Sequence, residues 1–179
     1  MEKLTITEAL SELNLIKKKV DNKRKIVAGS LIKAKHEKDA FENVGGIKAY
    51  ITSELQSIDD LESRYLRIKG SIAKANIENN ITINGFTKTI HDWLNWKRDL
   101  SDTQKKFVFN LYSFPKGELD KLSKQPQIYL DDNKEKHLVE FEATIDYPSF
   151  LKKSEELNDT FDRLDGQLSL KNATIVVDF

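Results

Sequence analysis

A seven-residue apolar repeat between Gly46 and Asn76 constrains this chain more than any other feature. One position of the repeat is filled by Ile51, Ile58, Tyr65 and Ile72, and the other by Ile47, Leu61, Ile68 and Ala75. Such a repeat makes one apolar stripe along a helix, which another helix must cover. At a rise of 1.5 Å per residue the helix would be roughly 45 Å long. The repeat therefore predicts a helical bundle or coiled coil.

A second helix is predicted to fold back on the first, beginning at the N-cap Thr87. Its apolar residues recur every three or four positions: Ile90, Trp93, Leu94, Leu100, Phe107, Val108 and Leu111. The connector 77–85 alternates apolar and polar residues, and Asn84 and Gly85 both tolerate positive φ. The connector is therefore expected to be a short extended excursion with a tight turn.

The N-terminal segment carries another stripe of the same kind. Thr5 to Glu8 has the form of a capping box. The apolar residues that follow are Ile6, Ala9, Leu13, Ile16, Val20 and Val27. The pattern weakens near Gly29, although its phase continues from Ala34 to Phe41, and Asn43 to Gly46 form a break. A first long helix is therefore predicted to begin after Thr5.

The C-terminal half mixes irregular, extended and helical patterns. Residues 113–136 are predicted to be irregular because Pro115, Gly117 and Pro126 interrupt them, with at most a helical turn at 118–122. The segments 127–130 and 137–145 alternate in the manner of a β-hairpin.

A last helix is predicted from Asp146 to Asn172, followed by a strand at 174–179. The strand needs a partner, which could be segment 139–145, the connector around Ile81, or a neighbouring subunit. The predicted fold is α+β: a bundle of long antiparallel coiled-coil-like helices with a small antiparallel β-sheet at one end.

Size and composition indicate one domain covering residues 1–179. The 29 basic and 29 acidic residues cancel, so the field that attracts nucleic acid is absent and nucleic acid is not an expected partner. The chain has no cysteine, which excludes disulfides and thiolate chemistry. It also has no long apolar run or apolar signal core, so no membrane partner is expected and a cytoplasmic location is predicted.

Residues 17–25 form the densest charged run, with five lysines and one arginine. Two interpretations stay open. The run is either a solvated face balanced by acidic residues of neighbouring helices or a patch that contacts phosphate. No aromatic residue is interleaved with it, which argues against stacking of bases.

Catalytic and metal-binding patterns are sparse. His36, His91 and His137 are too far apart in sequence for the usual zinc spacing. Glu155, Asp159 and Asp162 share a helix face, which suits Mg²⁺ or Ca²⁺ but more commonly pairs with lysines. The sequence therefore predicts no metal site, no cofactor and no enzymatic activity.

The richest polar cluster surrounds the predicted helical hairpin. Its candidate ligand-binding residues are Asn76, Asn79, Asn80, Asn84, Trp96, Lys97, Arg98 and Asp99. Asparagine offers both donors and acceptors, Arg98 suits a phosphate, and the indole of Trp96 lies off the main apolar phase. The alternative is that the asparagines serve as turn and cap residues and that Arg98 pairs with an acidic neighbour.

The order of these parts resembles the septicolysin-like family of small bacterial and phage proteins. The resemblance lies in short motifs at residues 8–10, 75–79, 85–90 and 97–99, and in Leu164-Asp165 followed by Asn172. Ser169 and Ala173 depart from the Gln and Trp usual in that family. The resemblance implies a homo-oligomer, and it adds Asn172 to the candidate ligand-binding residues.

Two hypotheses of function follow. The first is a non-enzymatic, homo-oligomeric binding protein that holds a small anionic or nucleotide-like ligand at the sheet end or between subunits, for example a phage protein that sequesters a signalling nucleotide. The second is a structural or adaptor protein of a virion or another assembly, without a small ligand. A metal-dependent hydrolase using the acidic stripe is third.

Overall fold

The computed structural model describes residues 2–32, 39 and 41–179, which form two compact units. Unit 1 comprises Met1–Asn80 and Leu168–Phe179, and unit 2 comprises Ile81–Gln167. The last helix contributes residues to both. Whether the chain behaves as a single domain stays a prediction.

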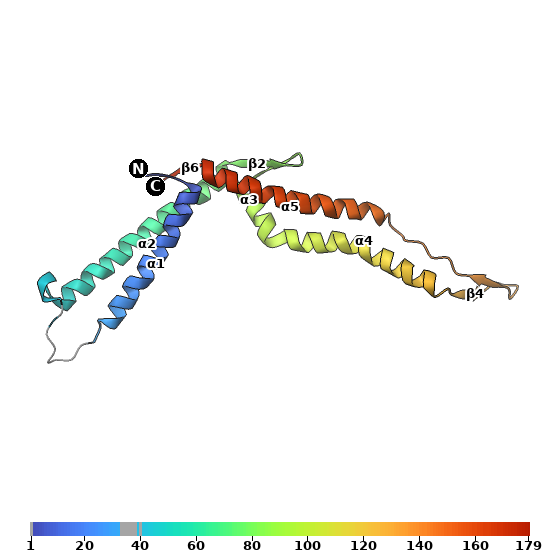
Figure 1. Ribbon diagram of the computed structural model, residues 1–179, viewed down its shortest axis with the longest axis horizontal. Coiled ribbons are helices and arrows are strands. Elements are labelled where there is room, and N and C mark those ends of the chain that lie inside the picture. The colour runs from blue at the N-terminus through green and yellow to red at the C-terminus, as the bar shows by residue number, and fades with distance from the viewer. Residues whose placement is uncertain (1, 33–38, 40) are drawn as a thin grey trace. The chain divides into compact units, whose positions relative to one another are not determined.

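The described residues are mostly helical, with three small two-stranded sheets (Figure 1), and this confirms the α+β class. The helices are α1 (Ile6–Gly29), α2 (Gly46–Glu78), α3 (Ile90–Asn95), α4 (Ser101–Lys124) and α5 (Pro148–Thr174), with short turns η1 (Glu42–Val44) and η2 (Trp96–Leu100). The strands are β1 (Lys3–Thr5), β2 (Asn80–Ile83), β3 (Phe86–Thr89), β4 (Ile128–Leu130), β5 (Lys136–Leu138) and β6 (Val176–Asp178). The sequence predicted one sheet, whereas the strands form the separate pairs β1–β6, β2–β3 and β4–β5.

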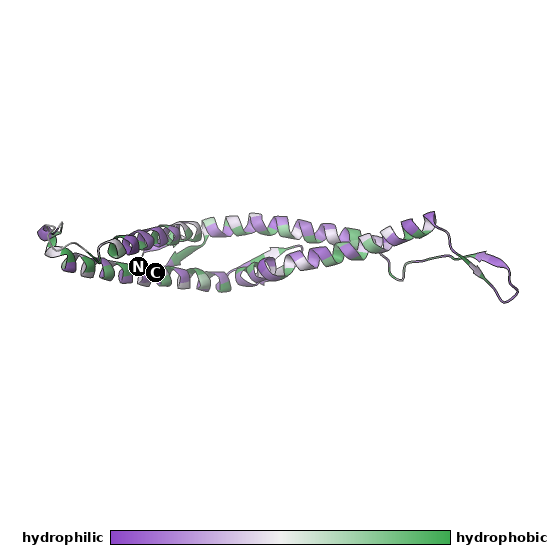
Figure 2. Cartoon of the chain, turned by 90° about the horizontal axis from the view of Figure 1, so that it is seen from below, coloured by the Kyte–Doolittle hydropathy of each residue, from purple (hydrophilic) through white to green (hydrophobic). Residues whose placement is uncertain are grey.

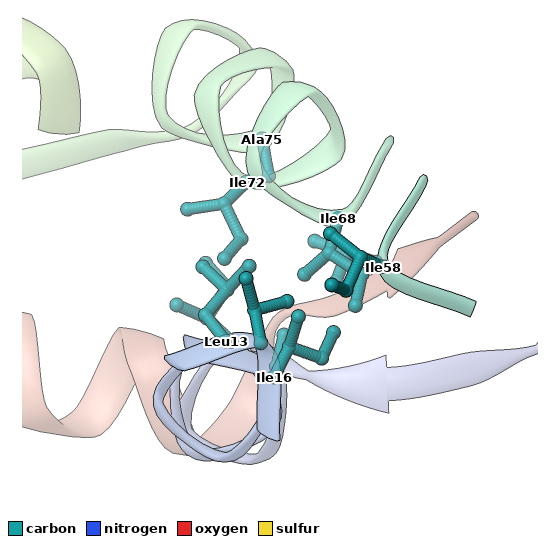
Figure 3. Close-up of a cluster of buried hydrophobic side chains, with 10 residues drawn as sticks. Leu13, Ile16, Ile58, Ile68, Ile72 and Ala75 are labelled. Carbon is teal, nitrogen blue, oxygen red and sulfur yellow. The ribbon is translucent and has the colours of Figure 1, made fainter. Parts of the chain in front are cut away.

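Unit 1 is built on the pair α1 and α2, which lie side by side in Figure 1. Their predicted stripes form one core, in which Leu13 and Ile16 of α1 meet Ile68 and Ile72 of α2 (Figure 3). Ile68 is fully buried. The seven-residue repeat is therefore satisfied within this unit.

The N-terminus of α1 has the predicted capping box. The Thr5 hydroxyl oxygen accepts a hydrogen bond from the backbone N–H of Glu8 at 3.2 Å, and the Thr5 N–H donates to the Glu8 carboxylate at 2.8 Å. These bonds lower the pKa of Glu8, the backbone bond contributing most. The box fixes the start of α1 directly after β1.

The C-terminal strand β6 pairs with β1, which the sequence analysis did not consider as its partner. The register places Leu4 opposite Val177 and Thr5 opposite Val176. Val177 is buried in the core of α1 and α2, and the Ser71 hydroxyl donates to the Asp178 carbonyl at 2.6 Å. The strand pair thus joins the two chain ends to the helical pair.

Acidic residues of α2 neutralise part of the positive charge of the basic run 17–25 on α1. Lys23 pairs with Glu54 at 2.8 Å and Arg24 pairs with Glu62 at 2.6 Å. The Lys17 ammonium lies over the Tyr65 ring, 5.7 Å from its centroid. These contacts favour a balanced helix face over a phosphate patch.

Unit 2 begins with the predicted excursion, a tight hairpin of β2 and β3. Asn84 (φ 51°) and Gly85 (φ 81°) make its turn in the left-handed region. The Thr82 and Thr87 hydroxyls are 2.8 Å apart across the strands. Thr87 is therefore a strand residue, and the cap of the return helix is Thr89, whose hydroxyl accepts from the Asp92 N–H at 3.0 Å.

The prediction that residues 113–136 are irregular is wrong for the first half of that segment. Helix α4 continues to Lys124 with Pro115 inside it. Proline removes one helical hydrogen bond, but Leu119 and Leu122 are half-buried and keep the helical phase beyond it. The interruption is thus accommodated within the helix.

The predicted hairpin after α4 is present but shorter than expected. Strands β4 and β5 pair antiparallel with Tyr129 opposite His137, and segment 139–145 is not a strand. Helix α5 then begins at Pro148 and extends two residues beyond the predicted end at Asn172. None of the described helices is long and apolar enough to span a membrane.

Candidate functional site

Four of the predicted ligand-binding residues, Trp96 to Asp99, lie on η2, a π-helical turn between α3 and α4. A π-helical turn inserts an extra residue into a helix and is frequent at functional sites. Here its effect is local. It turns Trp96 inward and leaves Arg98 and Asp99 exposed.

The indole of Trp96 is a core group, which leaves little of its ring open for stacking on a ligand. Only 9% of Trp96 is exposed. Its ring meets Trp93 edge-on with centroids 5.6 Å apart, and its Nε1–H donates to Gln104 Oε1 at 2.7 Å. The Trp93 indole in turn donates to the Ile81 carbonyl at 3.0 Å. The two indoles thus tie η2 to β2.

The charged residues of η2 have partners within unit 2. Lys97 pairs with Asp165 of α5 and lies 4.8 Å from the centroid of the Phe161 ring. The Arg98 guanidinium donates to both oxygens of Asp99 at 2.7 and 2.8 Å. This contact raises the pKa of Arg98 and lowers the pKa of Asp99, chiefly through the hydrogen bonds. The alternative stated from the sequence, that Arg98 pairs with an acidic neighbour, is confirmed.

Asn84 lies in the hairpin turn and reaches α5. Its side-chain amide donates to the Thr160 hydroxyl at 2.9 Å and lies 3.4 Å from Asp159. It also lines an open cleft of about 640 Å³ with Phe86, Val108, Lys153, Glu156, Leu157, Asp159 and Thr160. The cleft has two carboxylates and one ammonium, so its wall does not favour an anion.

The other predicted asparagines, Asn76, Asn79, Asn80 and Asn172, belong to unit 1. Asn79 is the C-cap of α2, and its side chain donates to the Ala75 carbonyl at 2.9 Å. Asn80 begins β2 and is exposed, while Asn172 is half-buried on α5. Asn76 Oδ1 is buried and accepts no hydrogen bond from the described residues. A buried acceptor without a donor is rare, which makes Asn76 the least satisfied of these groups.

A possible metal-binding group appears where the sequence predicted none. Asp131, Glu135 and His137 each offer one ligand atom, and these atoms lie within 4.8 Å of one another. The group belongs to the β4–β5 hairpin, where Asp131 Oδ1 also accepts the backbone N–H of Asn133 at 3.0 Å and of Glu135 at 2.8 Å. Imidazole and carboxylates suit a divalent transition metal. The same contacts also serve to close the turn, so they do not by themselves indicate an ion.

His91, and Asp159 of the acidic stripe, have ordinary partners. His91 lies 2.9 Å from the amide of Asn95, and His36 falls outside the described residues. Asp159 pairs with Arg163 at 2.8 Å, which is the chief cause of its lowered pKa, with Asn84 a lesser one. Asp159 of the stripe thus pairs with an arginine of its own helix, whereas the sequence predicted pairing with lysines.

The feature that sequence reasoning missed is the uncovered apolar surface of unit 2. Helix α4 has one buried residue, Ser101, whereas Phe107 and Phe114 are 62% and 69% exposed. In Figure 2 green and purple alternate along the long helices, as amphipathic helices require. The periodicity revealed an apolar face on α4, but periodicity alone does not show whether a face is covered.

Comparison of the chain with protein-family profiles, with curated proteins and with solved structures finds no match. The resemblance to the septicolysin-like family therefore stays a prediction.

Proposed function

We propose that this protein is a non-enzymatic structural or adaptor protein that acts as a homo-oligomer. The observation that carries the proposal is the shortage of core in unit 2, residues 81–167, all of which the structure describes. Its buried apolar residues are Ile81, Ile83, Ile90, Trp93, Trp96 and Leu164. Its exposed large apolar residues are Phe86, Leu94, Leu100, Phe107, Phe109, Phe114, Ile128, Tyr129, Leu130, Leu138, Phe141, Ile145 and Leu151.

Exposed apolar residues are common singly, but here they concentrate on particular elements. All three residues of β4 are exposed, and so are all three of β5. An isolated two-stranded hairpin is marginally stable in water. The hairpin and α4 therefore both lack the cover that a folded chain normally supplies, and association with further copies would supply it.

Unit 1 provides the contrast within the same chain. The stripes of α1 and α2 are buried against each other, so this unit has a core of its own. Unit 1 therefore has the larger buried core, and unit 2 is the unit that would gain most from a core formed by association.

Concentration-dependent melting tests the proposal. Association of folded chains stabilises them by mass action, so the melting temperature rises with protein concentration. We expect the circular-dichroism melt to shift upward by several degrees between micromolar and hundred-micromolar protein. A midpoint independent of concentration over that range would contradict the proposal.

A ligand-binding function remains a second candidate because of the cleft beside Asn84. Its volume of about 640 Å³ falls within the range of small-molecule sites. Its wall carries two acidic side chains and one basic side chain, so it suits a neutral or cationic ligand better than a nucleotide. Thermal shift against nucleotides, sugars and polyamines tests this candidate. Saturable stabilisation that Asn84→Ala abolishes would support it, and a flat response would remove it.

A further inference from the structure

A row of three exposed apolar side chains runs along α4. Leu100 directly precedes the helix, and Phe107 and Phe114 follow at intervals of seven residues. They are 53%, 62% and 69% exposed. Seven residues make almost two helical turns, so the three side chains share one face of the helix. We call Leu100, Phe107 and Phe114 the α4 stripe.

The side of α4 that is directed at α5 lies about 100–160° round the helix from Phe107. Val108 lines the cleft with Leu157 and Thr160, and the Lys105 ammonium lies 3.5 Å from the centroid of the Phe161 ring. Contacts with α5 therefore occupy a different face of α4 and leave the α4 stripe open. The stripe has the spacing of a coiled-coil seam without a partner helix.

We propose that the α4 stripe binds the same stripe of a second copy, with the two helices antiparallel about a twofold axis at Phe107. This inference rests on the proposed homo-oligomer and names its interface. In the proposed register Phe107 faces Phe107 of the second copy, and Leu100 faces Phe114. A twofold axis makes one patch complementary to itself, and equal spacing lets each side chain meet a side chain.

The helix dipoles favour the antiparallel orientation. Antiparallel packing opposes the dipoles of the two copies of α4, whereas parallel packing aligns like ends. The proposed twofold axis at Phe107 gives the antiparallel arrangement.

The area is that of a small but specific interface. A phenylalanine buries about 150–250 Å² when covered, so the exposed parts of Phe107 and Phe114 amount to about 100–170 Å² each. With Leu100 the stripe offers roughly 300–400 Å² of apolar surface per chain. If about 60% of the interface is apolar, the total is roughly 1,000–1,300 Å², at the lower end of specific interfaces.

Cysteine cross-linking tests the inference cleanly because the chain has no cysteine of its own. Under mild oxidation Phe107→Cys should form a covalent dimer. Phe114→Cys should not do so alone, but a mixture of Leu100→Cys and Phe114→Cys chains should form a mixed dimer. Phe109→Cys is the matched control, because Phe109 is 49% exposed but lies about 200° round the helix from Phe107.

The outcomes separate this interface from the proposed function. Self-linking of Phe114→Cys equal to that of Phe107→Cys would overturn the antiparallel register. If the unlinked protein is oligomeric by light scattering but Phe109→Cys links as well as Phe107→Cys, or neither links, the α4 interface is wrong while the homo-oligomer stands. A monomeric protein overturns both. Each variant's circular-dichroism melt shows that it is folded before it is oxidised.

Discussion

Trp96 shows how the surroundings of one residue decide its role. Its position off the apolar phase of the return helix suggested an indole that stacks on a ligand or covers a second interface, and in the structure it lies against Trp93 and Gln104. The π-helical turn shifts the phase of the residues around it, and the sequence carries no clear signal for such a turn. The buried position of the indole therefore goes with a local change of helical register.

The buried position of Trp96 predicts a large effect on stability. Replacing a buried tryptophan with alanine removes packed surface and leaves a cavity, so Trp96→Ala should lower the free energy of unfolding by about 3–5 kcal/mol. Urea denaturation measures it. Arg98→Ala, at an exposed position two residues further along the same turn, should change it far less. Equal effects of the two substitutions would contradict the structural role given to Trp96.

The pKa of Asp159 offers a second test at this scale. Hydrogen bonds from Arg163 and Asn84 hold it below the ordinary value of 3.8, so the contact stabilises the fold above about pH 4 and is lost as the pH falls through the lowered pKa. Arg163→Gln should raise this pKa toward its ordinary value, and Asn84→Ala should raise it less. Titration of the carboxyl carbon by NMR measures both. An unchanged pKa in Arg163→Gln would show that the pair does not persist in solution.

Helices α1 and α2 are the elements that the sequence predicted best. Their seven-residue repeats specify the helices and their apolar faces. The predicted partner of α2 was the return helix, however, whereas in the structure the stripe of α2 packs on that of α1. The tail strand β6 was also recognised, but not its partner. The three residues of β1 are too few to show a strand pattern, and Leu4 suggested only a hydrophobic staple before the capping box.

Helix α4 was predicted to end too early because Pro115 and Gly117 are read as helix breakers. Both are local penalties of limited size, and the helix continues through them. The same reasoning hid the length of the α4 stripe, since Phe114 stood at the edge of a predicted irregular segment. The sequence could therefore not predict the candidate interface, because the recognised helical pattern ended at Leu111.

Replacement with alanine should have opposite effects on stability at Gly70 of α2 and at Gly45, the N-cap of α2. A methyl group at Gly70 would meet nothing within 4 Å, so Gly70→Ala should stabilise the protein by about 0.5–1 kcal/mol. Gly45, the N-cap, has φ +88°, and an added Cβ would lie 3.2 Å from Ala49 Cβ. Gly45→Ala should therefore destabilise by about 1 kcal/mol or more. Thermal melts compare the two, and a shift of the same sign in both would argue against this start of α2.

At the level of the whole molecule, the sequence indicated long amphipathic helices and suggested an oligomer, but not which surfaces remain uncovered. Several residues of the predicted polar site have partners of their own. Lys97, Arg98 and Asn84 are engaged within unit 2, while Asn79 caps a helix of unit 1. Unit 2 also exposes many large apolar side chains, which supports the proposed assembly.

The molar mass in solution, measured by light scattering over a range of concentrations, tests the central claim most directly. One chain has a mass of 20.6 kDa. We predict a mass of at least two chains that declines on dilution, and a lower mass for the double variant Phe107→Ser/Phe114→Ser than for the Phe109→Ser control at equal concentration. A mass of one chain for the unmodified protein at every concentration would contradict the claim.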